Sequence, residues 1–493
     1  MRGKRIIPII FFYVALILLP STTVKAERSV YTYTYDFWEV ERESPDAYSV
    51  NETVTGSKLG IGDFNDPQGL YVRDNRIYVS DTGNNRIVIL ERDEDKNIKV
   101  IDQISEFSGD VENKTFSQPN DVFVTETGEL FVADTNNQRV LHLSQELELI
   151  KVINRPVDQT VDAASDFLPT KLVVDAAGRC FVLAKNYNKG FLQYDIDGRF
   201  IGYMGASEVK FNFTDYVWKL LSTQKQKSRL AQFVPTEYNN VAIDQYGFLY
   251  ATNSIFEEFQ LRNDEAKPIR KLNSMGTDIL VKNGPLPPIG DQWWGNAGGV
   301  SGASRFIDIT VLDNDVYYAL DRTRGRIFGY DEQGNLLYAF GSLGNKRGYL
   351  QFPTAIEHMA NDLLILDARS LGITFLTLTE YGNLINDAIM SYSLGQYDKS
   401  ADYWREVLRH NGNYDMAYVG IGRALLRQER YKEAMEYFEF ALDDDNYSKA
   451  FQLYRKEWIE DNITWILTSF FLIITVPFVI GKIKKIRREV DAE

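Results

Sequence analysis

The sequence predicts a mainly β fold of repeated antiparallel meanders, followed by a small helical module and one transmembrane helix. The phrase SDTGNNRIVIL, which begins at Ser80, returns as ADTNNQRVLHL at Ala133. A helical repeat with a period of 34 residues follows, from Tyr397 to Tyr431. Repeats of this kind indicate stacked structural units rather than one active site. An uncharged stretch from Ile463 to Gly481 is long enough to cross a bilayer.

The N-terminus has the three parts of a secretory signal. The basic start MRGKR precedes an apolar run over residues 6–19, and the small residues Val24 and Ala26 follow. This order predicts a signal peptide over residues 1–26. An uncleaved membrane anchor is the alternative reading of the same stretch.

Six copies of one β unit follow the signal sequence. Each copy opens with a turn residue and continues as an alternating strand, a Gly, Asn or Asp turn, and a second strand. Such copies are typical of antiparallel meanders, and their repetition predicts a β-propeller over residues 27–386. The copies begin at Asp66, Gln118, Leu168, Val234, Phe306 and Phe352.

Three further segments belong to this predicted propeller. Residues 27–40 alternate tyrosines with Val and Thr, which predicts a strand that completes the sixth blade and closes the ring. Residues 207–232 have apolar positions at helical spacing and predict a surface helix. Residues 283–304 form a Pro/Gly-rich loop that carries Trp293 and Trp294.

In three copies an Asp and an Arg stand five residues apart. An Asp at a strand end can accept hydrogen bonds from backbone amides of the following turn. We expect the Arg, at the start of the next strand, to reach back to that carboxylate. These structural turn pairs are Asp81 with Arg86, Asp134 with Arg139, and Asp321 with Arg326.

The repeated phrases resemble the NHL repeat, whose members form six-bladed β-propellers. The resemblance is clearest in the first, second and fifth copies. Lys185 and Asn253 stand where the third and fourth copies would carry the Asp, so those turns are expected to differ.

Residues 387–461 resemble tetratricopeptide repeats. Fewer than three repeats are present, so we expect the module to pack on the propeller or on the helix that enters the membrane. The resemblance implies helix packing through Tyr397, Ala417, Gly420, Ala424, Tyr431, Ala434, Phe438 and Ala441.

The C-terminal region predicts a single-pass membrane protein. The transmembrane helix is expected over residues 462–481, and the basic segment 482–493 marks the cytoplasmic side. The signal peptide, propeller and helical module are then extracellular. A formal net charge of −15 argues against nucleic acid as a partner. Cys180 is the only cysteine, and an exported chain without disulfides favours a bacterial source.

No catalytic motif accompanies this architecture, so the sequence favours a binding or scaffold protein. Its partner would be a protein or a cell-surface glycan, and an accessory role in a transport system is suggested by analogy. Trp293 and Trp294 are candidate stacking residues for a ligand, or else they fold under their loop and plug the ring. Asn120, Asn240 and Asp308 follow blade openings and could line a central channel.

The alternative is a metal-dependent hydrolase or lyase. Gluconolactonase-like propellers hold a divalent metal in the channel through Glu, Asn and Asp. We expect no cofactor for the binding protein, and a stoichiometric metal would favour the enzyme.

Overall fold

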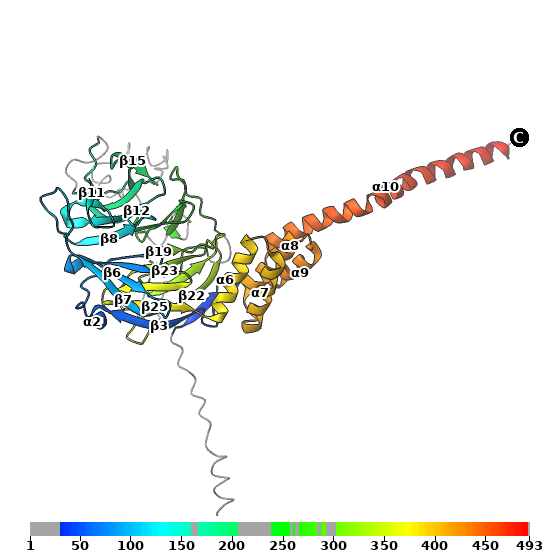
Figure 1. The fold of residues 1–493 in the computed structure, drawn as a ribbon. Coiled ribbons are helices and arrows are strands. Elements are labelled where there is room, and N and C mark those ends of the chain that lie inside the picture. Colours follow the sequence, from blue (N-terminus) through cyan, green and yellow to red (C-terminus); the bar gives the residue numbers. More distant parts are fainter. Residues whose placement is uncertain are drawn as a thin grey trace, which may run out of the picture.

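The structure is a computed structural model that describes residues 30–158, 166–205, 238–256, 260–261, 266–282, 287–291 and 302–491. The expected signal peptide, the helical insertion at 207–232, and Trp293 and Trp294 lie outside the described residues. The described chain forms a β-propeller, a group of helices beside it, and one long helix that projects away (Figure 1).

Six antiparallel sheets form the blades, numbered here in chain order by their first strands. The first three blades have four strands each. The first consists of β4 (Gly69–Arg73), β5 (Arg76–Asp81), β6 (Arg86–Arg92) and β7 (Ile98–Ile104). The second consists of β8 (Pro119–Val124), β9 (Leu130–Asp134), β10 (Arg139–Leu143) and β11 (Leu149–Ile153). The third consists of β12 (Leu168–Val174), β13 (Cys180–Lys185), β14 (Phe191–Tyr194) and β15 (Phe200–Met204).

The other blades differ in the number and origin of their strands. The fourth has β16 (Asn240–Ile243), β17 (Leu249–Thr252) and β18 (Ile269–Leu272). The fifth has β19 (Phe306–Val311), β20 (Tyr317–Asp321), β21 (Arg326–Tyr330), β22 (Leu336–Phe340), β1 (Thr32–Tyr35) and β2 (Glu41–Glu43). The sixth has β23 (Pro353–Met359), β24 (Asp362–Asp367), β25 (Gly372–Leu378) and β3 (Tyr48–Thr55). Short helical turns are α2 (Gly56–Leu59), η1 (Thr82–Asn84) and η2 (Thr135–Asn137).

Burial along the strands explains their composition. The second strand of a blade is covered on both faces by neighbouring blades, and every residue of β20 is buried. Such strands are therefore nearly continuous apolar runs. The outer strand β7 is largely exposed and has a mixed polar sequence. First strands of adjacent blades contact one another around the whole ring, so they surround its centre.

The expectation that residues 27–40 complete the sixth blade is wrong. Strand β1 pairs with β22 of the fifth blade, and β3 completes the sixth by pairing with β25. The physical reason is twofold. Pairing with β3 extends along all of β25, which leaves β1 no place there. In the fifth blade, Tyr33 of β1 is fully buried and its hydroxyl donates to Asp291 over 3.0 Å.

The helical module begins earlier than the expected boundary at residue 387. Thr379 follows the last strand, and its side chain accepts a hydrogen bond from the Gly382 amide, so the first helix starts at Glu380. Consecutive helices pack on one another. They are α6 (Glu380–Ser393), α7 (Tyr397–His410), α8 (Asp415–Arg427), α9 (Tyr431–Phe440) and α10 (Asp444–Val490).

Small residues allow these helices to approach closely. A Cβ at Gly420 would lie within 2.3 Å of the Trp404 ring, and one at Gly422 would meet Phe438. The expected packing positions on α8 and α9 are buried at Ala417, Gly420, Ala424, Ala434 and Phe438, as is Ala441 just after α9. Tyr397 and Tyr431 are only half-buried.

Helix α10 is continuous from the helical module through the uncharged stretch to the basic tail. Within the described residues it is the one helix long and apolar enough to cross a membrane, and none of its apolar stretch is buried by the rest of the chain. Figure 1 shows it leaving the module as a straight extension.

Candidate functional site

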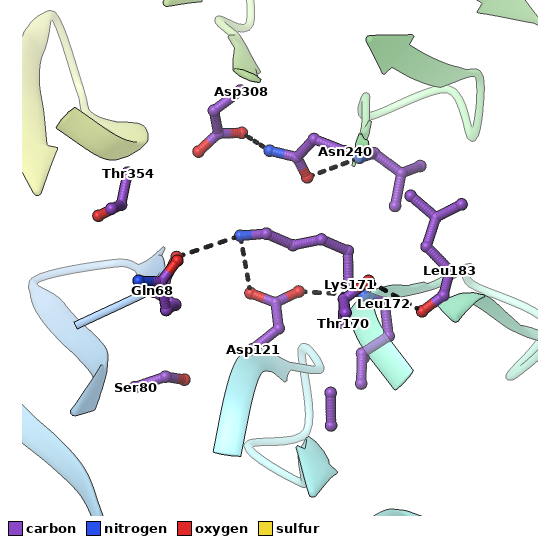
Figure 2. Close-up of polar contacts among 12 residues, drawn as sticks. Gln68, Ser80, Asp121, Thr170, Lys171, Leu172, Leu183, Asn240, Asp308 and Thr354 are labelled. Carbon is purple, nitrogen blue, oxygen red and sulfur yellow. Dashed lines mark hydrogen bonds and ion pairs between the residues drawn. The ribbon is translucent and has the colours of Figure 1, made fainter. Parts of the chain in front are cut away.

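The centre of the ring carries one structurally equivalent residue from each first strand. Each of them pairs with the same place on the second strand of its blade. Polar side chains occupy this position in four successive blades, and small residues occupy it in the other two. In chain order the residues are Gly69, Asp121, Lys171, Asn240, Asp308 and Ala355. Figure 2 shows that the four polar side chains point toward one another.

Lys171 is the central cation of this group. Its Nζ lies 3.5 Å from Asp121 Oδ1 and 3.5 Å from the carbonyl oxygen of Gln68 (Figure 2). The Leu172 amide donates to Asp121 Oδ2 over 3.0 Å. Burial acts to lower the pKa of Lys171, but the charges of Asp121 and Asp308 outweigh burial and raise it. The ammonium group is therefore charged at neutral pH.

Asp308 lies across the channel from this pair. Its carboxylate accepts hydrogen bonds from the Asn240 side-chain amide, from the Ile309 amide at 2.7 Å and from the Ile356 amide at 2.7 Å. Burial nevertheless raises the pKa of Asp308 to about 7. This carboxyl group changes its charge near neutral pH.

Glu357 is a second carboxyl group with a raised pKa. Its Oε2 accepts from the Thr310 hydroxyl at 3.1 Å and from the His358 amide at 3.2 Å. Burial, together with the charge of Asp308, raises the pKa of Glu357 to about 8. The His358 ring lies 2.7 Å from the Thr310 hydroxyl, and burial lowers the pKa of this histidine. The channel thus carries several groups that can exchange protons near neutral pH.

These residues form one end of a cavity of about 1050 Å³. From them the cavity extends to the turns that join the first and second strands. Tyr71 and Phe123 form a tilted ring pair in its wall, with centroids 4.8 Å apart. Ten carboxyl side chains line the cavity against four Lys or Arg side chains, so it favours cationic or neutral polar ligands over anions.

The structure places two of the three residues expected at the channel in the wall of the cavity. Asn240 and Asp308 line the cavity, whereas Asn120 does not. Asn120 is the extra residue of a β-bulge between Pro119 and Asp121, and the bulge turns Asp121 to the place expected for Asn120. Sequence reasoning missed Lys171 and Glu357 as well. For Asp121 and Lys171 the available signal was a polar residue two positions after the opening proline.

The residues of the channel do not fit a divalent metal. No group of three or more His, Cys, Asp or Glu side chains within the described ranges could hold a metal ion. The Lys171 ammonium group already supplies the positive charge beside Asp121, where a metal would need open carboxylate oxygens.

The Asp–Arg turn pairs are present in the first two blades. Asp81 lies 2.7 Å from Arg86, and Asp134 lies 2.8 Å from Arg139, with both carboxylates fully buried. The other carboxylate oxygen accepts a backbone amide from the loop before the first strand, at 2.7 Å in both blades. These amides precede the blade, whereas the sequence analysis expected amides of the following turn.

The third pair differs from the expectation. Arg326 contacts Asp291 and donates to the Tyr33 hydroxyl at 2.9 Å, while Asp321 accepts from the Arg305 amide at 2.7 Å. The reason is that β1 brings Tyr33 into the fifth blade, where Asp291 offers the guanidinium another carboxylate.

Comparison with known proteins defines the class. The model of the NHL repeat matches residues 64–90 and 116–143, which cover most of the first two blades. The fold is a six-bladed β-propeller, and segments of its first two blades match the NHL repeat. No curated protein matches it.

Several solved structures have a similar fold at low identity. The virginiamycin B lyase of Staphylococcus aureus is 11% identical, with a TM-score of 0.38 over 66% of this chain and 99% of that one. A protein described as a gluconolactonase is 11% identical, with a TM-score of 0.39 over 68% and 94%. A surface component of the type-IX secretion system of Porphyromonas gingivalis is 11% identical, with a TM-score of 0.33 over 68% and 38%.

Proposed function

We propose that this chain is a membrane-anchored binding protein whose propeller and helical module contact a protein or glycan partner outside the cytoplasm. The observation that carries the proposal is a hydrophobic core shared by the propeller, the helical module and the start of α10. A shared core makes the three parts one platform, which suits a protein that presents a binding surface at a fixed place above a membrane.

The shared core begins in the last two blades. Leu320, Leu337 and Ile356 of the propeller belong to the same buried cluster as Trp404 of α7 and Ala450 of α10. Hydrogen bonds accompany this apolar packing.

Two hydrogen bonds cross the same boundary. The Tyr414 hydroxyl donates to the Leu337 carbonyl at 2.7 Å, and the Thr379 hydroxyl donates to the Asp46 carbonyl at 2.6 Å. Buried apolar contacts and buried hydrogen bonds together resist hinge motion between the domains. The helical repeats thereby serve as a rigid stalk in the proposal.

The proposed orientation rests on charge. The basic residues after the uncharged stretch support a cytoplasmic tail, and in that orientation the propeller lies on the opposite side of the membrane. A neighbouring membrane protein, such as a transport system, is within reach of a platform held in this way.

The metal-dependent hydrolase is not proposed, because Lys171 and the surrounding donors do not suit a metal. The channel instead supports binding of a cationic or neutral polar group, since carboxylates are in excess in its wall.

The proposal is tested by photo-crosslinking in intact cells with the full chain. A benzoylphenylalanine probe replaces Tyr246, which is 65% exposed at the mouth of the channel, or Phe451 on α10, which is 45% exposed. Ile101 on the outer strand β7, 47% exposed, is the control position. We expect a discrete protein or glycan adduct at Tyr246 or Phe451 and none at Ile101. Absence of adducts at both test positions would contradict a binding role.

A further inference from the structure

A second concave surface lies where the propeller meets the helical module. We call it the junction groove, and it has a volume of about 720 Å³. One wall comes from the β1–β2 connection, with Phe37 and Trp38. The other wall comes from the helical module, with Tyr418, Phe440 and Leu442. These walls are far apart in sequence, so only the folded platform brings them together.

The side chains of the groove are unusually exposed for their type. Trp38 is 71% exposed, Phe440 is 67% exposed and Leu442 is 46% exposed. Single exposed apolar residues are common, but three of them gathered in one concave surface are typical of an interaction site.

The geometry of the groove is fixed by hydrogen bonds. Asp36 accepts from the amides of Trp38 and Val40, both at 2.9 Å, and forms an ion pair with Arg42 at 2.6 Å. The Phe37 amide donates to Asp415 of α8 at 3.0 Å. The exposed rings are thus held in place by the chain itself, which lowers the entropy lost when a partner binds.

Two non-glycine residues in or beside the groove have left-handed backbone conformations. Leu442, just beyond the C-cap of α9, has φ of 55°, and Glu39 in the β1–β2 connection has φ of 57°. Glycine is the preferred residue at such left-handed positions because it has no Cβ. Leu442 therefore combines a backbone conformation that glycine prefers with a half-exposed side chain.

The charges of the groove indicate what it binds. Three carboxylates, on Asp36, Glu43 and Asp415, line it together with one guanidinium, on Arg42. Arg42 is already paired with Asp36. The surface therefore favours a partner that carries positive charge beside apolar side chains.

The position of the groove favours a polypeptide over a lipid surface. It lies at the start of α10, and 19 residues (463 − 444) separate that start from Ile463, where the uncharged stretch begins. At 1.5 Å per residue this places the groove about 28 Å from the membrane. Lipid headgroups would not reach it.

We propose that the junction groove docks an extracytoplasmic protein segment in which leucine or aromatic side chains are flanked by Lys or Arg. This inference rests on the proposed binding function and names the chemistry of one partner. The apolar side chains pack against Trp38, Phe440 and Leu442, and the flanking cations lie beside Glu43 and Asp415.

The test uses the purified full chain in detergent and two labelled peptides of defined sequence. One is Lys-Lys-Leu-Phe-Leu-Leu-Lys-Lys, and the other replaces each Lys by Glu. Fluorescence anisotropy is expected to show at least tenfold tighter binding of the basic peptide, with affinity falling as salt rises. Equal affinity for both peptides would overturn the proposal.

Leu442→Gly is the most informative variant. Glycine relieves the backbone strain, so the folded platform is kept while one apolar contact is lost. We expect Leu442→Gly and Trp38→Ala each to weaken binding of the basic peptide at least fivefold, and Ile101→Ala on the outer strand β7, which lines neither the groove nor the channel, to leave it unchanged. Unchanged binding in Leu442→Gly, with an unfolding midpoint at or above that of the wild type, would overturn the proposal.

Two further outcomes separate this inference from the proposed function. Self-association of the chain that Leu442→Gly abolishes, without peptide binding, would make a second copy the occupant and overturn the inference. A crosslink at Tyr246 that persists in Leu442→Gly would leave the binding function intact even when the groove fails its own test.

Discussion

Lys171 determines the charge balance at the centre of the propeller. It is the one Lys or Arg side chain at the six equivalent channel positions, and its partner Asp121 is buried. Replacing Lys171 by Met removes the cation and keeps much of the volume. Because Asp121 would then be buried without a counter-charge, we expect the variant to lose about 3–5 kcal/mol of unfolding free energy.

The matched control is Lys267→Met. Lys267 pairs with Asp278 at 3.0 Å but its side chain is 39% exposed, so loss of this pair should cost less than about 1 kcal/mol. Denaturant unfolding of both variants gives the comparison. Equal losses of unfolding free energy in the two variants would show that the cation in the channel is no more important for stability than an exposed one.

The raised pKa values in the channel predict a pH dependence of stability. Asp308 and Glu357 have pKa values raised to about 7 and about 8, whereas the ordinary values are 3.8 and 4.5. The folded chain therefore keeps protons that the unfolded chain has lost between about pH 4 and pH 8. Stability from these groups is greatest at the acidic end of this window and falls as pH rises through it.

Glu357→Gln should flatten this dependence. The amide cannot ionise, so the slope of unfolding free energy against pH decreases by up to about 1.4 kcal/mol per pH unit between pH 5 and pH 7. Thermal or denaturant unfolding across this range measures the slope. Parallel profiles for wild type and variant would contradict the assignment of a raised pKa to Glu357.

At the residue scale the sequence predicts what depends on local spacing. The Asp81–Arg86 and Asp134–Arg139 pairs are five residues apart on one hairpin, so strand geometry alone brings them together. The channel residues depend on a β-bulge of one residue at the start of β8, which alternation does not reveal. Asp121 was therefore missed while its neighbour Asn120 was chosen.

Strand β1 is far from the fifth blade in the sequence, yet it pairs with that blade and stabilises it. Tyr33 is fully buried there, its hydroxyl donates to Asp291, and the Arg326 guanidinium lies over its ring at 4.6 Å. We expect Tyr33→Ala to cost about 3–5 kcal/mol, since it removes a large buried side chain together with its hydrogen bond to Asp291.

Val40→Ala serves as the control because Val40 is 45% exposed and belongs to the same β1–β2 region. Its effect should stay within about 0.5 kcal/mol. Chemical unfolding followed by tyrosine fluorescence measures both. A loss below about 1 kcal/mol in Tyr33→Ala would show that β1 is dispensable for the blade.

At the element scale, alternation predicts strands but not their partners. The alternating tyrosines of residues 31–35 predict a strand, but they do not indicate whether it pairs with the fifth blade or the sixth. The actual sixth-blade strand, β3, is an edge strand whose middle residues are only half-buried, and Glu52 interrupts the apolar alternation in its sequence YSVNETVT. Ring closure by two strands thus follows from packing of distant segments.

The whole molecule combines features that the sequence predicts well with an arrangement that it does not. The repeats predict the propeller, and an uncharged stretch followed by cations predicts the membrane helix. The shared core joins Leu337 to Trp404 and Ala450, which are far apart in the chain. Such contacts, and the junction groove that they create, appear only in three dimensions.

Helix α10 is proposed to hold the propeller outside the cytoplasm, and cysteine labelling in intact cells tests this orientation. Cys180 is the only cysteine and is buried, and burial raises the pKa of its thiol, so the wild-type chain is an unreactive background. Met275→Cys places a thiol on the propeller at a side chain that is 86% exposed, and Asp491→Cys places one after α10.

A membrane-impermeant maleimide is applied before and after lysis, and the mass of the chain is measured. We predict that Met275→Cys is labelled in intact cells, that Asp491→Cys is labelled only after lysis, and that the wild type is unlabelled until it is denatured. Labelling of Asp491→Cys in intact cells, with Met275→Cys protected, would place the propeller inside and contradict the account.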